Sequence, residues 1–255
     1  MKPISILEYI RLGSKLIYLW SAQEGEVVHL KDTILDNMNQ FINSVEKSEL
    51  KVTKNALNGL KEFKERLEKT PADHLLNKEE KDTLFNIMDK ILFVVTAESK
   101  TKFAFLLSEK RIDVNKLFYD ITSLFAENVF DFLPESSKID FAECGSCIAL
   151  DCTTASAFHV LRGLEGLLRF LLNKLDPNIH TSKMVWGDLI RELRNLNISD
   201  LGVLIDNLDR IRANYRNPTN HPEKIYNIEE AQDLFNLCVG VVNDIVTYMK
   251  VNNYI

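Results

Sequence analysis

The chain has 255 residues, of which 45% are hydrophobic, and its formal net charge is −6 at pH 7. Glycine and proline are scarce, which disfavours folds built on glycine-rich turns, and neither a Gly-x-x-x-x-Gly-Lys nor a Gly-x-Gly-x-x-Gly string is present. The acidic balance argues against a surface that coats nucleic acid broadly, although a local phosphate site remains compatible with it. We therefore expect an all-α protein with one large domain or two modest ones.

The N-terminal sequence lacks the basic, apolar and small-residue layout of a secretory signal peptide. No apolar run approaches the length that we expect of a membrane span. These two patterns predict a cytoplasmic protein that does not act in a membrane.

Apolar residues at helical spacing predict a long helix or a helical hairpin over residues 30–69. Asn77 followed by Glu80 is typical of an N-cap with a reciprocal glutamate, and the apolar spacing continues as a helix to about Val95. The stretch KFAFLLS at 102–108 fits either a short strand or a helix.

A further helix is expected over residues 113–129, and the sequence FDFLPESSKID then indicates a connection interrupted by Pro134. We place a domain boundary there. The expected organisation is a helical N-terminal region over 1–133 with a sensing, regulatory or partner-docking role, followed by a helical domain over 134–255.

The second region opens with a strongly amphipathic segment. Leucines at helical spacing mark its buried face: Leu161, Leu164, Leu168, Leu171 and Leu172. A polar stripe bordered by Glu165 follows on the other side: His159, Arg162, Gly166, Arg169 and Asn173. Such a stripe is either a solvated face or, because Gly163 and Gly166 are small, the place where another helix approaches closely.

Two more helices are expected before the last one. The sequence KMVWGDLIRELRNL predicts a helix with Trp186 and Leu189 facing inward. A helix over about 200–216 would bury the side that carries Leu204 and Leu208, with polar residues on the other side: Asp209, Arg212 and Arg216.

The sequence NYRNPTNHPEKIYN, residues 214–227, separates that helix from the last one. Pro218 disfavours helical geometry at Asn217, so we expect the helix to end with Arg216 in its last turn. Asn227 and Glu230 form a second capping-box pattern that starts the final helix. His221 is therefore expected in a short loop bracketed by two prolines.

Cysteine and arginine usage adds two observations. The Cys144-x-x-Cys147 spacing permits a redox or zinc site, but no second pair at comparable spacing exists, and on a helix both side chains can simply pack as small apolar groups. Arginines concentrate after residue 144, where they outnumber four lysines. Arginine suits bidentate phosphate contacts, although it also braces helices through its apolar stem.

Arg216 and Asn217, followed by His221 between two helices, resemble the Arg-x-x-x-x-His motif of the HEPN superfamily of prokaryotic ribonucleases and toxins. The segment ALDCTTASAFHVLRGLEGLLRFL, with RNPTNHPEKIY downstream, also looks like a group of bacterial HEPN-like proteins that carry an extra helical N-terminal region. The likeness covers about residues 124–250. Residues 1–123 carry no motif that we can assign.

The resemblance implies metal-independent cleavage of RNA, without a cofactor, at a composite site in a homodimer. RNA supplies its own nucleophile, the ribose 2′-hydroxyl, so the protein needs a group that moves protons and a cation that holds the phosphate. His221 suits the first role and Arg216 the second, while Asn217 could orient the histidine or donate to a phosphate oxygen. These three residues form the expected catalytic set.

Additional RNA contacts are expected from Arg212, Arg162, His159 and Tyr226, although such residues often only solvate or brace a helix. Some family members have a tyrosine two residues after the histidine, linked to control by a nucleotidyltransferase antitoxin, but this chain has Glu223 there. Control by tyrosine modification is therefore not expected.

Two functions follow from these patterns. One is an endoribonuclease that acts as a toxin or phage-defence effector, with an antitoxin or another defence protein as a possible partner. The alternative is a catalytically silent HEPN-like scaffold or binding subunit of a multi-component defence complex, which the acidic net charge and the unassigned first half favour.

Overall fold

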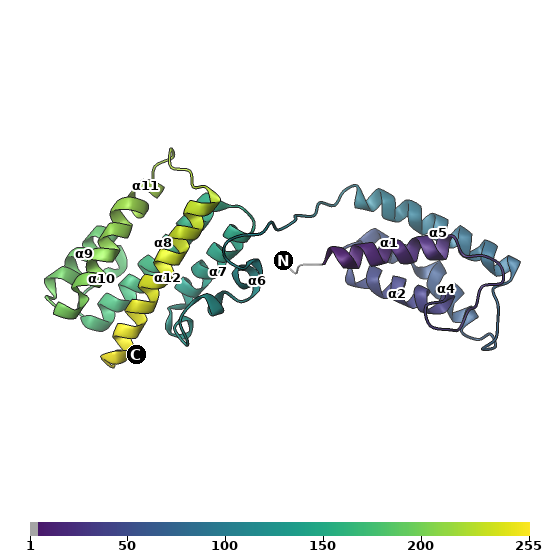
Figure 1. The fold of residues 1–255 in the computed structure, drawn as a ribbon, viewed down its shortest axis with the longest axis horizontal. Coiled ribbons are helices and arrows are strands. Elements are labelled where there is room, and N and C mark those ends of the chain that lie inside the picture. The colour runs from purple at the N-terminus through teal and green to yellow at the C-terminus, as the bar shows by residue number, and fades with distance from the viewer. Residues whose placement is uncertain (1–4) are drawn as a thin grey trace. The chain divides into compact units, whose positions relative to one another are not determined.

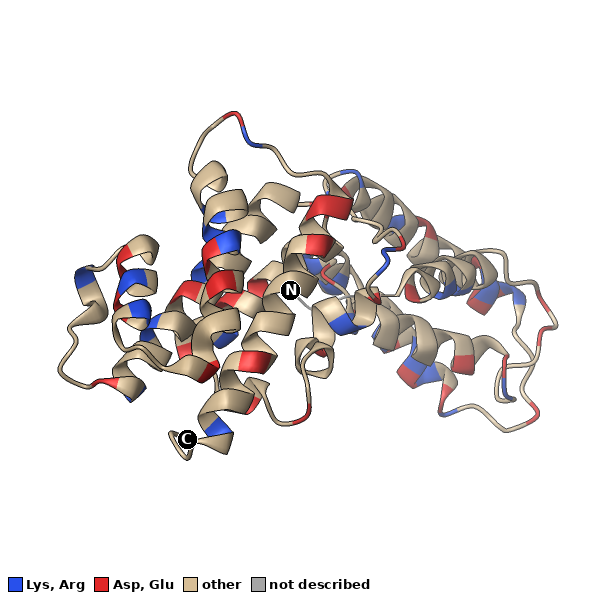
Figure 2. Ribbon diagram, turned by 60° about the vertical axis from the view of Figure 1, so that its left-hand side comes forward, with Lys and Arg blue, Asp and Glu red and all other residues tan. Residues whose placement is uncertain are grey.

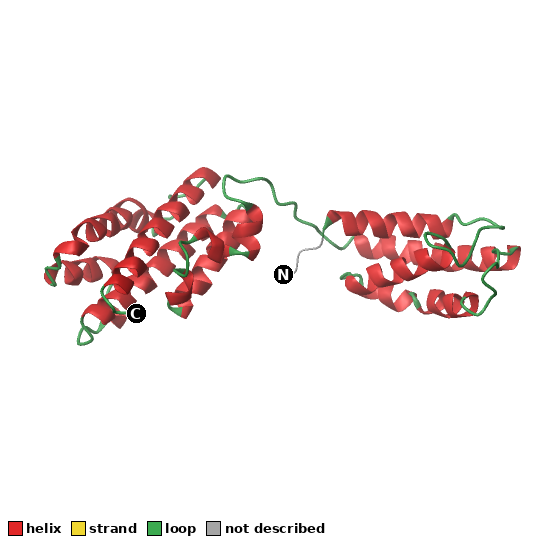
Figure 3. Cartoon of the chain, turned by 60° about the horizontal axis from the view of Figure 1, so that its bottom comes forward, coloured by secondary structure: helices red, strands yellow, loops and turns green. Residues whose placement is uncertain are grey.

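The computed structural model describes residues 5–255, and within that range the regular elements are helices and no strand forms (Figure 3). The expected all-α class is therefore confirmed. The chain divides into two compact units, unit 1 over residues 1–104 and unit 2 over residues 105–255 (Figure 1). Each unit has its own apolar core.

Unit 1 is a bundle of α-helices. They are α1 (Ile6–Trp20), α2 (Ile34–Lys47), α3 (Lys51–Ala56), α4 (Asn58–Leu67) and α5 (Lys78–Ser99). The expected long helix or hairpin over 30–69 is thus three helices. Ser48 ends α2 in extended backbone, and its hydroxyl donates to the Val45 carbonyl and accepts from the Leu50 N–H. A serine that satisfies these backbone groups locally breaks the helix.

The expected start of α5 is confirmed, because the Asn77 side chain accepts from the Glu80 N–H and the Glu80 carboxylate accepts from the Asn77 N–H. At the other end of α5, the buried Glu98 carboxylate accepts hydrogen bonds from the Val52 and Thr53 N–H groups and the Thr53 hydroxyl. Glu98 therefore ties α5 to the N-terminus of α3.

Residues 102–110 have no regular secondary structure, so the stretch KFAFLLS is neither a strand nor a helix. The chain divides between Ala104 and Phe105, not at the expected boundary between 133 and 134. The reason is packing: the core of unit 2 includes Leu117, Phe125 and Leu133, which the sequence had placed in the N-terminal region.

Unit 2 begins with short elements, and most of its remaining helices are longer. The short ones are α6 (Val114–Tyr119) and the 3₁₀ turns η1 (Ile121–Leu124) and η2 (Phe130–Phe132). The expected helix over 113–129 is therefore interrupted, because Asp120 adopts a non-helical conformation with φ −141° and ψ 56°. The following helices are α7 (Glu135–Ala149), α8 (Thr153–Leu175), α9 (Trp186–Asn195), α10 (Gly202–Ile211), α11 (Asn217–Thr219) and α12 (Ile228–Val251).

Helices α7 and α8 pack against each other, and small residues allow the close approach. A Cβ atom on Gly163 would lie 3.1 Å from the Asp140 Cβ atom, and one on Gly166 would lie 2.7 Å from the Ser137 Oγ atom. The Ser137 hydroxyl donates to the Gly163 carbonyl at 2.8 Å. Gly163 and Gly166 thus mark a helix contact.

The end of α10 differs from the expectation. Instead of stopping at Arg216, the chain continues through a π-helical turn, η5 (Arg212–Arg216), into α11. The Asn217 N–H donates to the Arg212 carbonyl, a bond over five residues. Because a proline ring clashes with the carbonyl four residues before it in an α-helix, this wider turn accommodates Pro218 without ending the helix.

Helix α12 crosses the core of unit 2 and begins at the expected capping box of Asn227 and Glu230. Its expected apolar face is buried: Ala231, Leu234, Phe235, Cys238, Val242, Ile245 and Met249. Contrary to the sequence expectation, α12 is long and apolar enough to cross a membrane by length and composition, but half of its apolar window is buried inside the protein. A core helix of a globular unit passes the same test.

The cysteines are free thiols, and Cys144 is buried in α7. Burial raises the pKa of the Cys144 thiol well above its ordinary value and also raises that of Cys147, which disfavours reactive thiolates. Basic and acidic residues are intermixed along the helices of both units (Figure 2).

Candidate functional site

Arg216 lies at the last position of the π-helical turn, where two side chains fix its guanidinium. Its Nε and Nη2 atoms lie 3.4 and 3.5 Å from the Glu165 Oε2 atom on α8, and Nη1 donates to the Asn220 side chain. The other carboxylate oxygen of Glu165 accepts from Arg169 at 2.7 Å. Glu165 thus bridges two arginines, and 29% of the Arg216 side chain remains exposed.

His221 lies one turn beyond Arg216. Its N–H donates to the Pro218 carbonyl at 2.9 Å and its carbonyl accepts from the Lys224 N–H at 3.1 Å, so the backbone is held in a turn. The side chain is exposed, and the imidazole makes no hydrogen bond to any residue in 5–255. Both ring nitrogens are thus available for proton transfer in the described part of the chain.

Asn217 is also exposed, and its carbonyl accepts from the Asn220 N–H at 3.2 Å. The expected catalytic set of Arg216, Asn217 and His221 is therefore placed within two turns at one end of the α10–α11 helix. Of the three, only Arg216 has a fixed side-chain partner among residues 5–255.

Of the other expected RNA contacts, one is buried and the rest are paired with carboxylates. Tyr226 is 2% exposed, and its hydroxyl lies 2.8 Å from the Thr219 hydroxyl, so it is a core residue and cannot contact RNA in this conformation. The Tyr226 ring belongs to the core of unit 2, and the polar residues around it in the sequence gave no sign of this burial. Arg212 donates to Asp209 at 2.8 Å on the same helix.

Arg162 and His159 converge on one buried carboxylate. Asp140 on α7, with 5% of its side chain exposed, accepts from Arg162 Nε at 2.8 Å to each oxygen and lies 3.0 Å from His159 Nδ1. These hydrogen bonds and the charge of Asp140 raise the pKa of Arg162. The Arg162 side chain is nevertheless 68% exposed, so its cation is anchored at one edge and open at the other.

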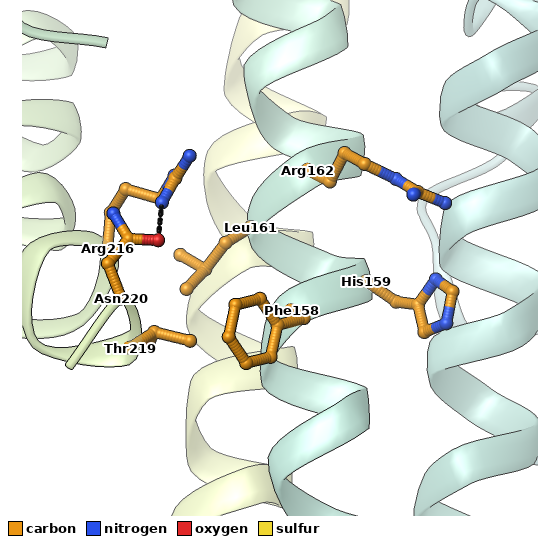
Figure 4. A pocket seen from close by; sticks show the side chains of 7 residues that line it. All are labelled: Phe158, His159, Leu161, Arg162, Arg216, Thr219 and Asn220. Carbon is orange, nitrogen blue, oxygen red and sulfur yellow. Dashed lines mark hydrogen bonds between the residues drawn. The ribbon is translucent and has the colours of Figure 1, made fainter. Parts of the chain in front are cut away.

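A pocket of about 260 Å³ joins the two arginine positions. Its lining is Phe158, His159, Leu161, Arg162, Arg216, Thr219 and Asn220. Figure 4 shows Arg216 and Asn220 on one side of the Phe158 ring, with His159 on the other side. His221 and Asn217 do not line this pocket.

Several residues of this site were missed by the sequence reasoning: Asp140, Asn220 and Phe158. Asp140 gave no signal, because its partners are 19 and 22 residues away in the chain. Asn220 lies four residues after Arg216, which is the spacing of neighbours on a helix, but the expected end of the helix hid that contact. Phe158 is an exposed aromatic residue in a helix whose other large apolar residues are mostly buried.

The arrangement can bind an anion and move a proton. Two arginines with partly exposed side chains line one pocket, and an exposed imidazole lies on the turn after α11. Within residues 5–255, no three His, Cys, Asp or Glu side chains are grouped so as to hold a metal ion.

Comparison with protein-family models, curated proteins and solved structures gives no match for this chain. The likeness to the HEPN superfamily therefore stays a prediction from the motif and its placement.

Proposed function

We propose that this protein is a metal-independent endoribonuclease of a toxin or phage-defence system, with Arg216 and His221 in a composite active site at a homodimer interface. The observation that carries the proposal is the α10–α11 end. A fixed guanidinium lies at the end of the π-helical turn, and an exposed imidazole without a hydrogen-bond partner in residues 5–255 lies on the turn that follows α11. This combination matches the two groups that RNA cleavage through the 2′-hydroxyl requires.

The chemistry assigns one task to each group. One His221 takes the proton of the ribose 2′-hydroxyl, whose oxygen attacks the adjacent phosphorus, while the His221 of the second copy protonates the leaving 5′-oxygen. Arg216 stabilises the charge that builds on the phosphate oxygens. The products are a 2′,3′-cyclic phosphate and a free 5′-hydroxyl.

A dimer is needed because one chain supplies one histidine at this site. The loop containing His221 is exposed and its backbone is fixed by hydrogen bonds to Pro218 and Lys224, so two copies can meet there with little ordering. Asn217 is the expected neighbour that orients the imidazole or the phosphate. Unit 1 is the candidate region for sensing or for docking an antitoxin or another defence protein in the cytoplasm.

The test is cleavage of labelled single-stranded RNA and transfer RNA by the purified full chain in EDTA. We compare the wild type with His221→Ala and Arg216→Ala, and we record the mass of each protein in solution. Cleavage by the wild-type dimer, lost in both variants while they stay dimeric, supports the proposal. End-group analysis that finds 3′-hydroxyl products contradicts the mechanism.

A second candidate is a catalytically silent scaffold. It is favoured by one observation: every nitrogen of the Arg216 guanidinium already has a partner, in Glu165 or Asn220, so the arginine could serve only to brace α8 against α11. A dimer that neither cleaves nor binds RNA would favour this candidate. Wild-type and His221→Ala proteins would then be tolerated equally on expression.

A further inference from the structure

Phe158 is one of several exposed aromatic residues of unit 2, and its place beside the arginine pocket sets it apart. It lies on α8, 48% exposed, whereas its neighbours Ala157, Val160 and Leu161 are buried in the core. It lines the pocket that also contains Arg216 and Arg162. Proteins bind single-stranded nucleic acids where an exposed aromatic ring and cationic side chains line one surface, because bases stack on the ring and phosphates contact the cations.

Arg162 is held in place by hydrogen bonds that leave part of its guanidinium without a partner in residues 5–255. Arg162 donates hydrogen bonds from Nε and Nη2 to the buried Asp140, which fixes its position. Its Nη1 atom has no hydrogen-bond partner among residues 5–255. His159 is fixed by the same carboxylate. A phosphate at this edge would therefore meet a guanidinium that is already oriented, which lowers the ordering required for binding.

The amide on the other side is also available. Asn220 accepts from Arg216 with its Oδ1 atom, and its Nδ2 group has no partner in the described residues. Figure 4 shows Asn220 across from the Phe158 ring, whereas the His159 side chain extends from the other side of α8 toward α7. The pocket of about 260 Å³ beside the ring is the space in which a stacked base would lie.

We propose that this pocket is a nucleotide subsite in which the Phe158 ring stacks one unpaired base of single-stranded RNA and Arg162 contacts the adjacent phosphate. This inference rests on the proposed action on RNA, and it names the substrate class as unpaired rather than duplex RNA. Stacking of this kind tolerates every base, so the subsite places the strand without selecting a sequence.

The test measures binding with the full chain in a His221→Ala background, which prevents cleavage, in EDTA. The probes are a ten-nucleotide oligouridylate and inorganic polyphosphate, which has charge but no bases. Phe158→Leu keeps an apolar side chain and removes the aromatic face. The matched control is Phe93→Leu, which removes a 77% exposed phenylalanine from unit 1.

Phe158→Leu is expected to weaken oligouridylate binding about 10-fold, since the loss of one base stack has an effect of this order. Polyphosphate binding and the dimer mass are expected to stay unchanged, as are all properties of Phe93→Leu. Phe158→Trp is expected to restore binding, and its indole fluorescence should be quenched when RNA is added. That quenching is a direct signature of stacking.

Four results would overturn the inference. The first two are oligouridylate binding that Phe158→Leu leaves unchanged and an equal loss of both probes, which indicates a structural role. The other two are dissociation of the dimer, which indicates a contact between copies, and absence of oligouridylate binding in the parent protein. If binding depends on Phe158 but the wild type does not cleave RNA, the subsite stands and the ribonuclease proposal fails. If the wild type cleaves RNA and Phe158→Leu binds normally, the ribonuclease proposal stands and the subsite fails.

Discussion

Each unit buries a carboxylate between two helices, but the two carboxylates have different partners. In unit 1, Glu98 accepts from backbone N–H groups and a hydroxyl, which are neutral donors inside the fold. In unit 2, Asp140 binds an arginine and a histidine whose other edges reach the surface. A carboxylate with neutral partners only holds helices together, whereas one that orients exposed cations also prepares a surface for an anion.

Glu165 of unit 2, like Asp140, binds cationic side chains rather than neutral donors. Glu165 is 17% exposed and fixes Arg169 and Arg216, which come from different helices. This network supports our proposal that the functional site lies in unit 2. Four predictions test the contrast, ordered from the largest expected effect to the smallest.

Loss of the His221 imidazole should have the largest effect. His221→Ala is expected to lower the RNA cleavage rate about 10³-fold, because general acid–base catalysis contributes on this scale. The stability should change by less than about 0.5 kcal/mol, since the side chain is exposed. Single-turnover cleavage and thermal unfolding measure the two effects, and His180→Ala, another exposed histidine of unit 2, is the matched control. Equal cleavage by both variants would remove His221 from the mechanism.

A methyl group on Gly145 tests whether α6 belongs to unit 2. Its Cβ atom would lie 2.4 Å from the Leu117 carbonyl oxygen and 2.7 Å from the Ile121 Cδ1 atom, so α6 must shift. Gly145→Ala should therefore destabilise unit 2 by about 3 kcal/mol.

Gly240→Ala on α12 is the control, because a Cβ atom there has no neighbour within 4 Å among the described residues. It should stabilise the same unit by about 0.5–1 kcal/mol. Denaturant unfolding measures the stability change of each variant, and hydrogen exchange followed peptide by peptide assigns the change to unit 2. Similar effects of the two substitutions would contradict the close packing of α6 on α7.

Asp140→Asn tests the anchoring of the exposed cations. It removes the charge that Arg162 and His159 share, so we expect unit 2 to lose about 2 kcal/mol of unfolding free energy. Oligouridylate binding should weaken too, because Arg162 is no longer fixed. Unfolding and RNA titration check this together, and stability lost with RNA binding unchanged would show that the cluster is only a brace.

Glu98→Gln tests the corresponding carboxylate of unit 1. Burial opposes its ionisation, but hydrogen bonds from Thr53 and Val52 outweigh that penalty and lower the pKa of Glu98 below its ordinary value of 4.5. Ionised Glu98 therefore stabilises unit 1 above about pH 4.5, and this contribution is lost as the pH falls through the lowered pKa.

We expect Glu98→Gln to destabilise unit 1 by about 1.5 kcal/mol at pH 7 and to leave RNA cleavage unchanged. The difference from the wild type should shrink as the pH falls below about 4.5, where the wild type loses its own ionised carboxylate. Unfolding at a series of pH values measures this. A difference that grows in acid would reverse the assigned role of Glu98.

Much of the local structure follows from the sequence alone. The capping boxes at Asn77 and Asn227 start α5 and α12 as expected, and the buried face of α12 follows its apolar spacing. These features are local, because each rests on residues three or four positions apart. The all-α class was predictable for the same reason, whereas the close approach at Gly163 and Gly166 was one of two alternatives that the sequence left open.

The tertiary structure alone decided the rest. Glu165 and Arg216 are 51 residues apart in the chain, and only the packing of α8 against the α10–α11 end brings them together. The same is true of Asp140 and Arg162, and of the unit boundary, which depends on where Leu117 and Phe125 are buried. A proline normally predicts the end of a helix from local sterics, but the fold widens the turn before Pro218 and keeps the helix, which places Asn220 beside Arg216.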